Sequence, residues 1–161
     1  MLSCVTVGIS KYENSYLIPI PCAADDARAV YDAFSQIMGP EFNNYLSICV
    51  SNIRSSDFES LLRVISDVIG EEPEDTDSIL VIYFSGHGVF DDKCYELQFP
   101  EYRDTGRGID GVFSAEQFSK IFKGKNIKVL IILDCCNSGA ALSIANVSDH
   151  GPEISVLAAV N

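Results

Sequence analysis

Residues 79–88 read Ile-Leu-Val-Ile-Tyr-Phe-Ser-Gly-His-Gly, and residues 129–139 read Val-Leu-Ile-Ile-Leu-Asp-Cys-Cys-Asn-Ser-Gly. Each stretch is a short apolar run, rich in β-branched residues, that ends in a turn of small and polar residues. Such runs are typical of strands buried on both faces of a parallel sheet. The sequence predicts five strands of this kind: Cys4–Ile9, Tyr45–Val50, Ile79–Phe84, Val129–Leu133 and Ile154–Ala159.

Amphipathic stretches separate these runs. One extends from Asp25 to Met38. A second begins at the apparent capping box Ser56-Asp57-Phe58-Glu59 and continues to Ile69, and a third begins at a similar box, Ser114-Ala115-Glu116-Gln117. Strands that alternate with helices predict an α/β three-layer sandwich around a mainly parallel central sheet.

The pattern breaks between Val89 and Gly111. Tyr95–Phe99 alternates in polarity like one arm of a half-exposed hairpin, whereas Pro100–Gly111 is polar and glycine-rich. We expect the region from Val89 to Gly111 to be an excursion loop near the functional edge of the sheet. No repeat, low-complexity tract or linker divides the chain, so residues 1–161 are predicted to form one domain.

Composition excludes several function classes. The net charge is -12, from 23 acidic and 11 basic residues, whereas nucleic acids and anionic membranes require a basic face. No apolar run approaches the roughly 18–20 residues that a membrane span needs. The six cysteines form no C-x-x-C pair and no convincing disulfide framework, which favours reduced thiols in a cytoplasmic protein.

His87 and Cys136 follow two of the predicted strands. Ligands bind at the carboxyl ends of strands in open α/β sheets, so both side chains are placed to face one cleft. An imidazole beside a thiol favours the thiolate and can later protonate an amine leaving group. Taken singly, the histidine is more often a turn residue and the cysteine a small buried hydrophobe. Zinc binding by His87 with Cys94, Cys135 or Cys136 is the alternative, although the spacing is wrong for a structural site.

The two stretches together resemble the His and Cys boxes of the caspase, metacaspase and paracaspase superfamily of cysteine peptidases. Tyr83–Gly88 is similar to the His box, and Leu133–Gly139 to the Cys box D-x-C-x-S-G of the metacaspase-like prokaryotic branch. The histidine lies roughly 50 residues before the cysteine, as in caspases. Val5–Ile9 and Cys22–Ala27 also resemble the first strand and first helix of that branch.

This resemblance implies a caspase-like fold with flavodoxin-like strand order, in which the chain corresponds to the large-subunit portion. It also implies a Cys–His dyad that forms a thioester acyl-enzyme. By motif position the nucleophile is Cys136, two residues after Asp134, while Cys135 fills a variable position. The backbone N–H groups of Gly88 and Cys136 are the implied oxyanion hole, and no carboxylate serves as a third catalytic member.

Metacaspase-like relatives cleave after Arg or Lys because carboxylates line the S1 pocket. Asp26 and Asp134 match those acidic positions here, with Asp25 as the alternative if the register differs by one residue. The structural alternative is that Asp26 favours a helix N-terminus and Asp134 caps a turn. Cleavage after Asp is disfavoured, because Pro19–Cys22 contains no arginine like the one that caspases use in S1.

The family domain continues beyond the strand that Ile154–Ala159 matches. We therefore expect Asn161 to be a processing site or the cut end of a longer chain. A small-subunit-like segment is expected to dock at that last strand, since an unpaired edge promotes aggregation.

Three further expectations concern activation and cofactors. Val129–Asn161 contains no Lys or Arg, so self-cleavage between Ser143 and Ile154 is disfavoured, and Lys93, Arg103 and Arg107 are better targets. No cofactor is expected. Calcium activation has weak support from the acidic positions Asp91, Asp92 and Asp104–Asp110.

A regulatory cysteine endopeptidase specific for a basic P1 residue is thus the leading interpretation. Its rival is a non-catalytic caspase-like scaffold, and a peptidase with a legumain-like preference for Asn is a third possibility.

Overall fold

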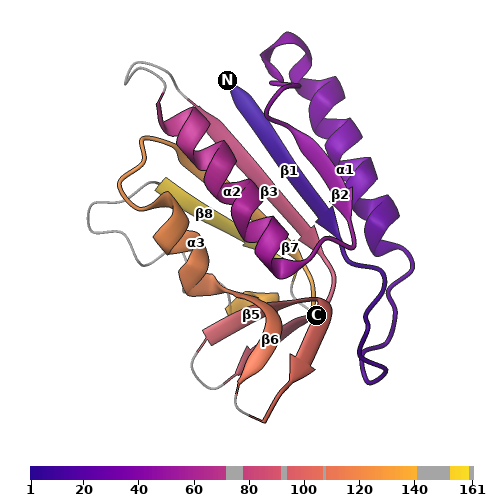
Figure 1. Ribbon diagram of the computed structural model, residues 1–161. Coiled ribbons are helices and arrows are strands. Elements are labelled where there is room, and N and C mark those ends of the chain that lie inside the picture. Colours follow the sequence, from indigo (N-terminus) through magenta and orange to yellow (C-terminus); the bar gives the residue numbers. More distant parts are fainter. Residues whose placement is uncertain (72–77, 92–93, 107, 141–152, 160–161) are drawn as a thin grey trace.

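The computed structural model describes residues 1–71, 78–91, 94–106, 108–140 and 153–159. Its centre is a sheet of five parallel strands, ordered β2-β1-β3-β7-β8 (Figure 1). Their bounds are β1 Leu2–Gly8, β2 Ile48–Ser51, β3 Ile79–Ser85, β7 Lys128–Asp134 and β8 Glu153–Ala158. The flavodoxin-like strand order and the parallel sheet predicted from the sequence are confirmed.

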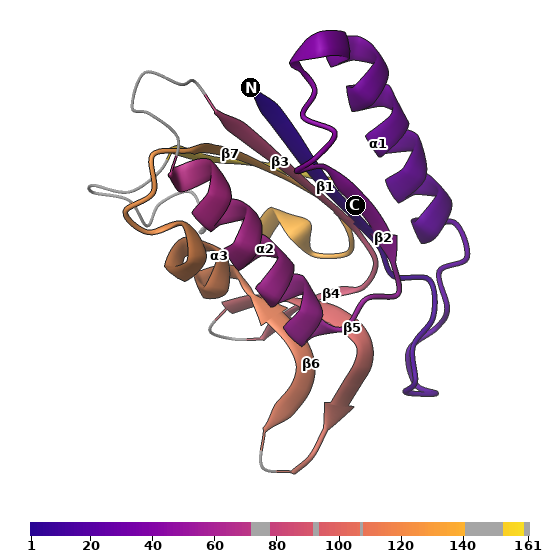
Figure 2. The same ribbon diagram turned by 45° about the horizontal axis from the view of Figure 1, so that its top comes forward.

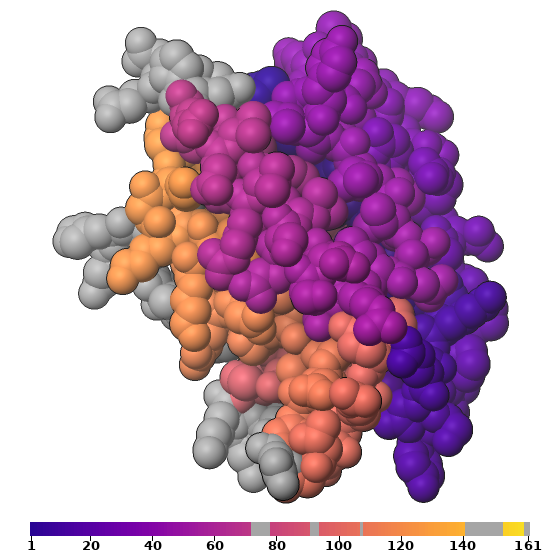
Figure 3. All heavy atoms as spheres, in the orientation of Figure 1, coloured from indigo at the N-terminus to yellow at the C-terminus, as the bar shows by residue number. Residues whose placement is uncertain are grey.

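Helices cover both faces of this sheet. Helix α1, Ala23–Met38, lies on one face and is followed by the short 3₁₀ helix η1, Gly39–Glu41. Helices α2, Ser55–Gly70, and α3, Ala115–Phe122, lie on the other face (Figures 1 and 2). In Figure 3 the side chains of α2 and α3 form a continuous surface in front of the central strands. The three-layer sandwich is confirmed.

Alternation along each strand explains the continuous apolar runs. In β1, Val5 and Val7 pack toward α2 and α3, whereas Leu2 and Cys4 pack toward α1. All seven residues of β1 are buried. Since both sides of the strand meet a helix layer, β1 is mostly apolar on both sides, and its polar residues are the small Ser3 and Thr6, both buried.

The part of the chain between β3 and α3 forms a second sheet. It is antiparallel, with order β4-β5-β6, and comprises β4 Gly88–Asp91, β5 Cys94–Asp104 and β6 Ile109–Ser114. The prediction of an excursion loop from Val89 to Gly111 is therefore wrong over most of its length, although the hairpin arm predicted at Tyr95–Phe99 lies within β5. The β5–β6 register shifts between Gln98 and Arg103, and such an irregularity accommodates Pro100, which has no N–H for the ladder.

Aromatic side chains join this second sheet to the main core. The ring of Phe58 on α2 lies 5.0 Å from that of Phe113 on β6, and Phe113 lies 4.7 Å from Phe118 on α3. In the same cluster, Phe99 of β5 lies 5.5 Å from Phe84 of β3. All five rings are almost completely buried, so the small sheet is part of the hydrophobic core.

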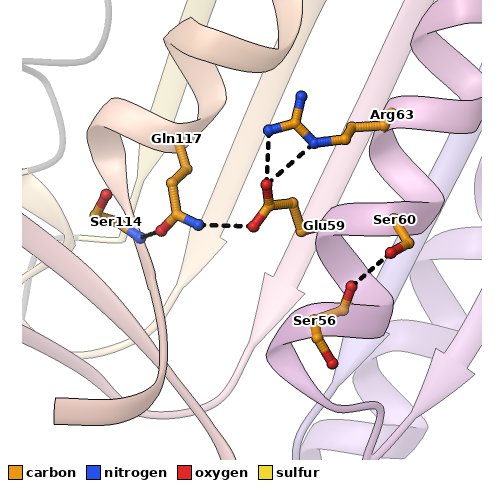
Figure 4. A network of polar contacts seen from close by, with 6 residues as sticks. All are labelled: Ser56, Glu59, Ser60, Arg63, Ser114 and Gln117. Carbon is orange, nitrogen blue, oxygen red and sulfur yellow. Dashed lines mark hydrogen bonds and ion pairs between the residues drawn. The ribbon is translucent and has the colours of Figure 1, made fainter.

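The predicted capping box at the start of α2 is wrong. The helix begins at Ser55 with no side-chain cap from its N-cap residue, Arg54. Glu59 turns instead to Arg63, 2.6 Å away, and to Gln117 of α3, 3.0 Å away (Figure 4). Glu101 of β5 supplies the missing acceptor, because its Oε1 lies 2.7 Å from both the N and the Oγ of Ser55.

The capping box of α3 is confirmed. Ser114 is the N-cap, and its backbone N–H donates to Oε1 of Gln117 at 2.7 Å (Figure 4). The same Gln117 side chain donates to Glu59, so one residue both caps α3 and ties it to α2.

A few apolar residues of the predicted helices and strands lie outside the core. Ile37 of α1 and Val68 of α2 are exposed, and Tyr45 precedes β2 rather than opening it. Met38 packs against the core in place of Ile37. These residues lie near the ends of helices or strands, where periodicity predicts the burial of a side chain least well.

We predict that Glu101→Ala lowers the free energy of unfolding by about 1–2 kcal/mol, because the first N–H of α2 loses its acceptor. Glu101→Gln keeps an acceptor oxygen and loses less. Urea denaturation measures both. The control is Asp110→Ala, which breaks only the exposed Arg103–Asp110 pair and costs at most about 0.5 kcal/mol. A loss for Glu101→Ala no larger than this control contradicts the prediction.

Candidate active site

The ends of β3 and β7 set the position of the site. The two strands pair in parallel, with Ser85 opposite Asp134. The backbone N–H of Gly86 donates to the carbonyl of Asp134 at 3.4 Å, which continues the contact past the strand ends. His87 and Cys136 each follow this matched pair by two residues, so the two predicted catalytic residues emerge at the same edge of the sheet.

Two residues of the β1–α1 connection hold His87. Its Nε2 lies 2.7 Å from the carbonyl oxygen of Ile18, and its ring lies 4.8 Å from the ring of Tyr12. The backbone N–H of His87 donates to the Tyr12 hydroxyl at 2.8 Å. Because a carbonyl only accepts, Nε2 carries a proton in this contact, and the neutral ring keeps its lone pair on Nδ1. Nδ1 is therefore the nitrogen that can take a proton from a thiol.

Cys136 lies exposed in the turn after β7. Asn137 follows with a φ of 57°, a left-handed conformation that Asn adopts more readily than most residues. The buried Ser138 hydroxyl then donates to the carbonyl of Ala159, directly after β8. The N–H of Ala159 in turn donates to the carbonyl of Leu133 at 3.0 Å. The end of β8 thus fixes the turn that carries Cys136.

The adjacent thiol of Cys135 lies in a different environment. It is 6% exposed, and burial raises its pKa to about 12. The hydroxyl of Tyr95 lies 2.8 Å from its sulfur and 3.0 Å from the carbonyl oxygen of Cys136. A buried thiol that stays protonated is inert as a nucleophile. Of the two neighbours, only Cys136 presents its sulfur to solvent.

Gly88 sits where a side chain would not fit. A Cβ at this position would lie 2.0 Å from the Tyr95 hydroxyl and 2.9 Å from the carbonyl oxygen of Cys136. The His box and the Cys box therefore make close backbone contact at Gly88. This is the geometric requirement behind the second glycine of Gly86-His87-Gly88.

Asp26 and Asp134 are an acidic pair whose charges both influence Cys22 and Tyr83. Tyr83 donates to Oδ2 of Asp134 at 3.0 Å. The pKa of the exposed Cys22 thiol is raised, first by its hydrogen bond to Asp26 and also by the charge of Asp134. The pKa of Tyr83 is raised by burial and by both carboxylates. The charge of Asp25 is not among the causes of either pKa shift.

Sequence reasoning missed four contributors to this region. They are Tyr12, the carbonyl of Ile18, Tyr83 and Tyr95. Tyr12 and Ile18 belong to a connection without periodicity, and a backbone carbonyl leaves no residue-type signal. Tyr83 and Tyr95 lie in predicted strand segments, and a buried tyrosine has the same pattern whether or not its hydroxyl has a function.

The described parts of the chain contain no candidate metal site. Nowhere in them do three or more His, Cys, Asp or Glu side chains lie close enough together to hold a metal ion. Two of the suggested calcium positions have other partners, since Asp104 accepts from the N–H of Gly106 and Asp110 pairs with Arg103. Several positions lie outside the described residues: Asp92, the proposed cleavage positions Lys93 and Arg107, and most of the Ser143–Ile154 connection.

None of the described helices has the length and apolarity to cross a bilayer.

The caspase domain family matches this sequence over residues 2–155. That match covers nearly the whole chain, and the fold and the two boxes agree with it. The chain belongs to the caspase domain family. A comparison with curated proteins finds no match.

Solved structures of similar fold include the Drosophila initiator caspase Dronc, with a TM-score of 0.59 and 13% identity over 82% of this chain. Protein GSU0716 from Geobacter sulfurreducens has a TM-score of 0.52 and 16% identity over 90% of this chain. This chain spans about half of each structure, 47% and 54% respectively. At these identities the likeness shows the fold.

We predict that Gly88→Ala lowers the free energy of unfolding by about 1–3 kcal/mol, because the added methyl overlaps the Tyr95 hydroxyl. The matched control is Gly108→Ala, where nothing lies within 4 Å of the added Cβ and the change stays within about 0.5 kcal/mol. Chemical denaturation of both variants provides the measurement. Equal stability of the two variants is inconsistent with the close contact.

Proposed function

We propose that this protein is a cysteine endopeptidase that cleaves its substrates after Arg or Lys, with Cys136 as nucleophile and His87 as acid and base. The observation that carries the proposal is the placement of the two residues. His87 has its Nε2 committed to the Ile18 carbonyl, and the exposed Cys136 thiol emerges from the neighbouring strand end. The remaining ring nitrogen is then available for proton transfer.

In the proposed reaction, Nδ1 of His87 takes the thiol proton and the Cys136 thiolate attacks the scissile carbonyl carbon. The carbonyl oxygen becomes an oxyanion, which the N–H groups of Gly88 and Cys136 are proposed to stabilise. The imidazolium returns its proton to the amine as the C–N bond breaks, leaving a thioester. Water, deprotonated by His87, then attacks the thioester carbonyl, and the thiol leaves with the proton restored.

Specificity for a basic P1 residue is supported by the acidic pair Asp26 and Asp134. Asp26 hydrogen-bonds the Cys22 thiol, and the charge of Asp134 also raises the pKa of that thiol, so both carboxylates contribute negative charge to this part of the surface. The Tyr83 hydroxyl donates a hydrogen bond to Oδ2 of Asp134 and so holds the carboxylate in place. A guanidinium or ammonium group between the two aspartates forms charge-assisted hydrogen bonds. The net charge of -12 also attracts a cationic substrate.

A further segment is proposed to complete the site. Among the described residues β8 pairs only with β7, so its outer edge is open to another strand. Leu157 on this strand is 60% exposed, and the chain spans about half of the related structures. We propose that a small-subunit-like segment covers this edge. A reducing compartment such as the cytoplasm is proposed because the thiols of Cys4, Cys22, Cys49, Cys135 and Cys136 form no disulfide.

The decisive experiment tests the complete natural polypeptide, with any small-subunit segment present, on peptides with Arg, Lys, Asn or Asp at P1. We expect hydrolysis after Arg and Lys, and a loss of at least about 1,000-fold in kcat for Cys136→Ala and His87→Ala. Cys135→Ser, the matched control, retains activity. Loss of hydrolysis in Cys135→Ser but not in Cys136→Ala would refute the choice of nucleophile. Absence of hydrolysis with every substrate would favour a non-catalytic scaffold.

For specificity, we predict that Asp26→Asn and Asp134→Asn each lower kcat/KM for the Arg peptide by about 10- to 100-fold, because a charge-assisted contact of 1.5–3 kcal/mol is lost. Asp25→Asn is the control, since Asp25 is exposed and its charge is not among the causes of the pKa shifts of Cys22 and Tyr83. Steady-state kinetics at constant ionic strength measure the ratio. An equal effect of all three changes would point to general electrostatic attraction instead of a pocket.

A further inference from the structure

The hydroxyl of Tyr95 lies between the two adjacent cysteines. Its oxygen is 2.8 Å from the sulfur of Cys135 and 3.0 Å from the carbonyl oxygen of Cys136. Tyr95 is 1% exposed and belongs to β5, 40 residues before Cys135 in the chain. The function proposed above gives no role to this hydroxyl or to the buried thiol.

The direction of the two hydrogen bonds follows from their atoms. The carbonyl oxygen of Cys136 can only accept, so Tyr95 gives its single hydroxyl proton to that oxygen. The contact with Cys135 then needs a proton from the thiol. Burial raises the pKa of Cys135 to about 12 and also raises that of Tyr95, so both groups keep their protons at neutral pH. The resulting chain is Cys135 S–H to Tyr95 O–H to Cys136 C=O.

We propose that Tyr95 and Cys135 are positioning residues that hold the Cys136 peptide in its reactive orientation. This inference rests on the proposed function, because it takes Cys136 as the nucleophile. It also gives each of the two adjacent cysteines a role: Cys135 is a buried hydrogen-bond donor, and Cys136 is the reacting thiol.

The position of the carbonyl explains how the effect reaches the nucleophile. The Cys136 carbonyl belongs to the planar peptide that joins Cys136 to Asn137, so fixing its oxygen fixes the plane. Asn137 has a φ of 57°, and a non-glycine residue persists in that region when its surroundings hold it there. The hydrogen bond from Tyr95 is one such restraint, and the bond from Ser138 to Ala159 is another on the far side of the turn.

The small antiparallel sheet supplies the rigidity. Tyr95 pairs with Phe90 in the β4–β5 ladder, and Gly88 leaves room for the Tyr95 hydroxyl to reach both cysteines. Phe99 and Phe113 anchor the same sheet against α2 through Phe58. The hydroxyl is therefore held by the hydrophobic core and does not depend on the turn that it supports.

The variants that test this series of hydrogen bonds remove one donor at a time. Tyr95→Phe removes the hydroxyl and keeps the ring. Cys135→Ala removes the thiol, whereas Cys135→Ser keeps an O–H donor of similar size. Tyr102→Phe is the matched control, because it removes a different tyrosine hydroxyl from the same strand, β5.

Two readouts are measured on each variant of the complete polypeptide: steady-state kcat and KM for the Arg peptide, and the rate of Cys136 alkylation by iodoacetamide, assigned by peptide mapping. We expect Tyr95→Phe and Cys135→Ala each to lower kcat and the alkylation rate about tenfold, the effect of losing one hydrogen bond of about 1.4 kcal/mol, with KM unchanged. Cys135→Ser and Tyr102→Phe stay within about twofold of the parent.

The double variant Tyr95→Phe with Cys135→Ala tests directly whether the two residues act through the same hydrogen bonds. Because both residues act through one chain of hydrogen bonds, it should lose no more than the larger single variant. Multiplied losses, or a Cys135→Ser variant as impaired as Cys135→Ala, overturn the proposal. Unchanged kcat and alkylation in Tyr95→Phe also overturn it.

Alkylation separates this proposal from the proposed function. If the parent protein hydrolyses no peptide, the peptidase assignment fails, while the alkylation rates still decide whether Tyr95 and Cys135 position Cys136. Thermal melting of each variant establishes that it is folded. Should Tyr95→Phe not fold, the comparison of Cys135→Ala with Cys135→Ser decides the question alone.

Discussion

The parallel pairing of β3 with β7 is the constraint on which the site depends. Its register sets Ser85 opposite Asp134, so the two turns that follow begin at one level of the sheet. A slip of one residue would turn every side chain of one strand to the opposite face and separate His87 from Cys136. The apolar side chains of both strands prevent this slip, because each face is buried under a helix layer.

Three segments distant in sequence converge on the two turns and restrain them. The β1–α1 connection holds His87 through Tyr12 and Ile18. The small antiparallel sheet reaches the cysteines through Tyr95, and the end of β8 holds Ser138. The strands thus bring the reactive groups to one edge, while these additional contacts determine their orientation. Chemistry at such a site depends on orientation at least as much as on proximity.

Much of the fold was predictable because its signals are local. Apolar runs of strand length, amphipathic helical stretches and the Ser114–Gln117 box each depend on residues close together in the chain. The second sheet was not predicted beyond one arm, since Pro100 and the polar residues after it have the composition of a loop. Their strand is stabilised by pairing with β6 and by Phe99 packing on distant rings. The predicted start of α2 is wrong for a related reason, because Glu101, which is distant in sequence, accepts from Ser55 in place of a local cap.

By itself, the sequence determined the α/β class, the strand order through the family resemblance, and the positions of His87, Cys136, Asp26 and Asp134 at strand and helix ends. These follow from short-range periodicity and from motifs in which spacing carries the information. The contacts of Tyr12 with His87 and of Tyr95 with Cys135, which span 75 and 40 residues, emerged only with the folded chain. A hydrogen bond between distant residues depends on atomic positions that the packed core creates, and no local pattern specifies them.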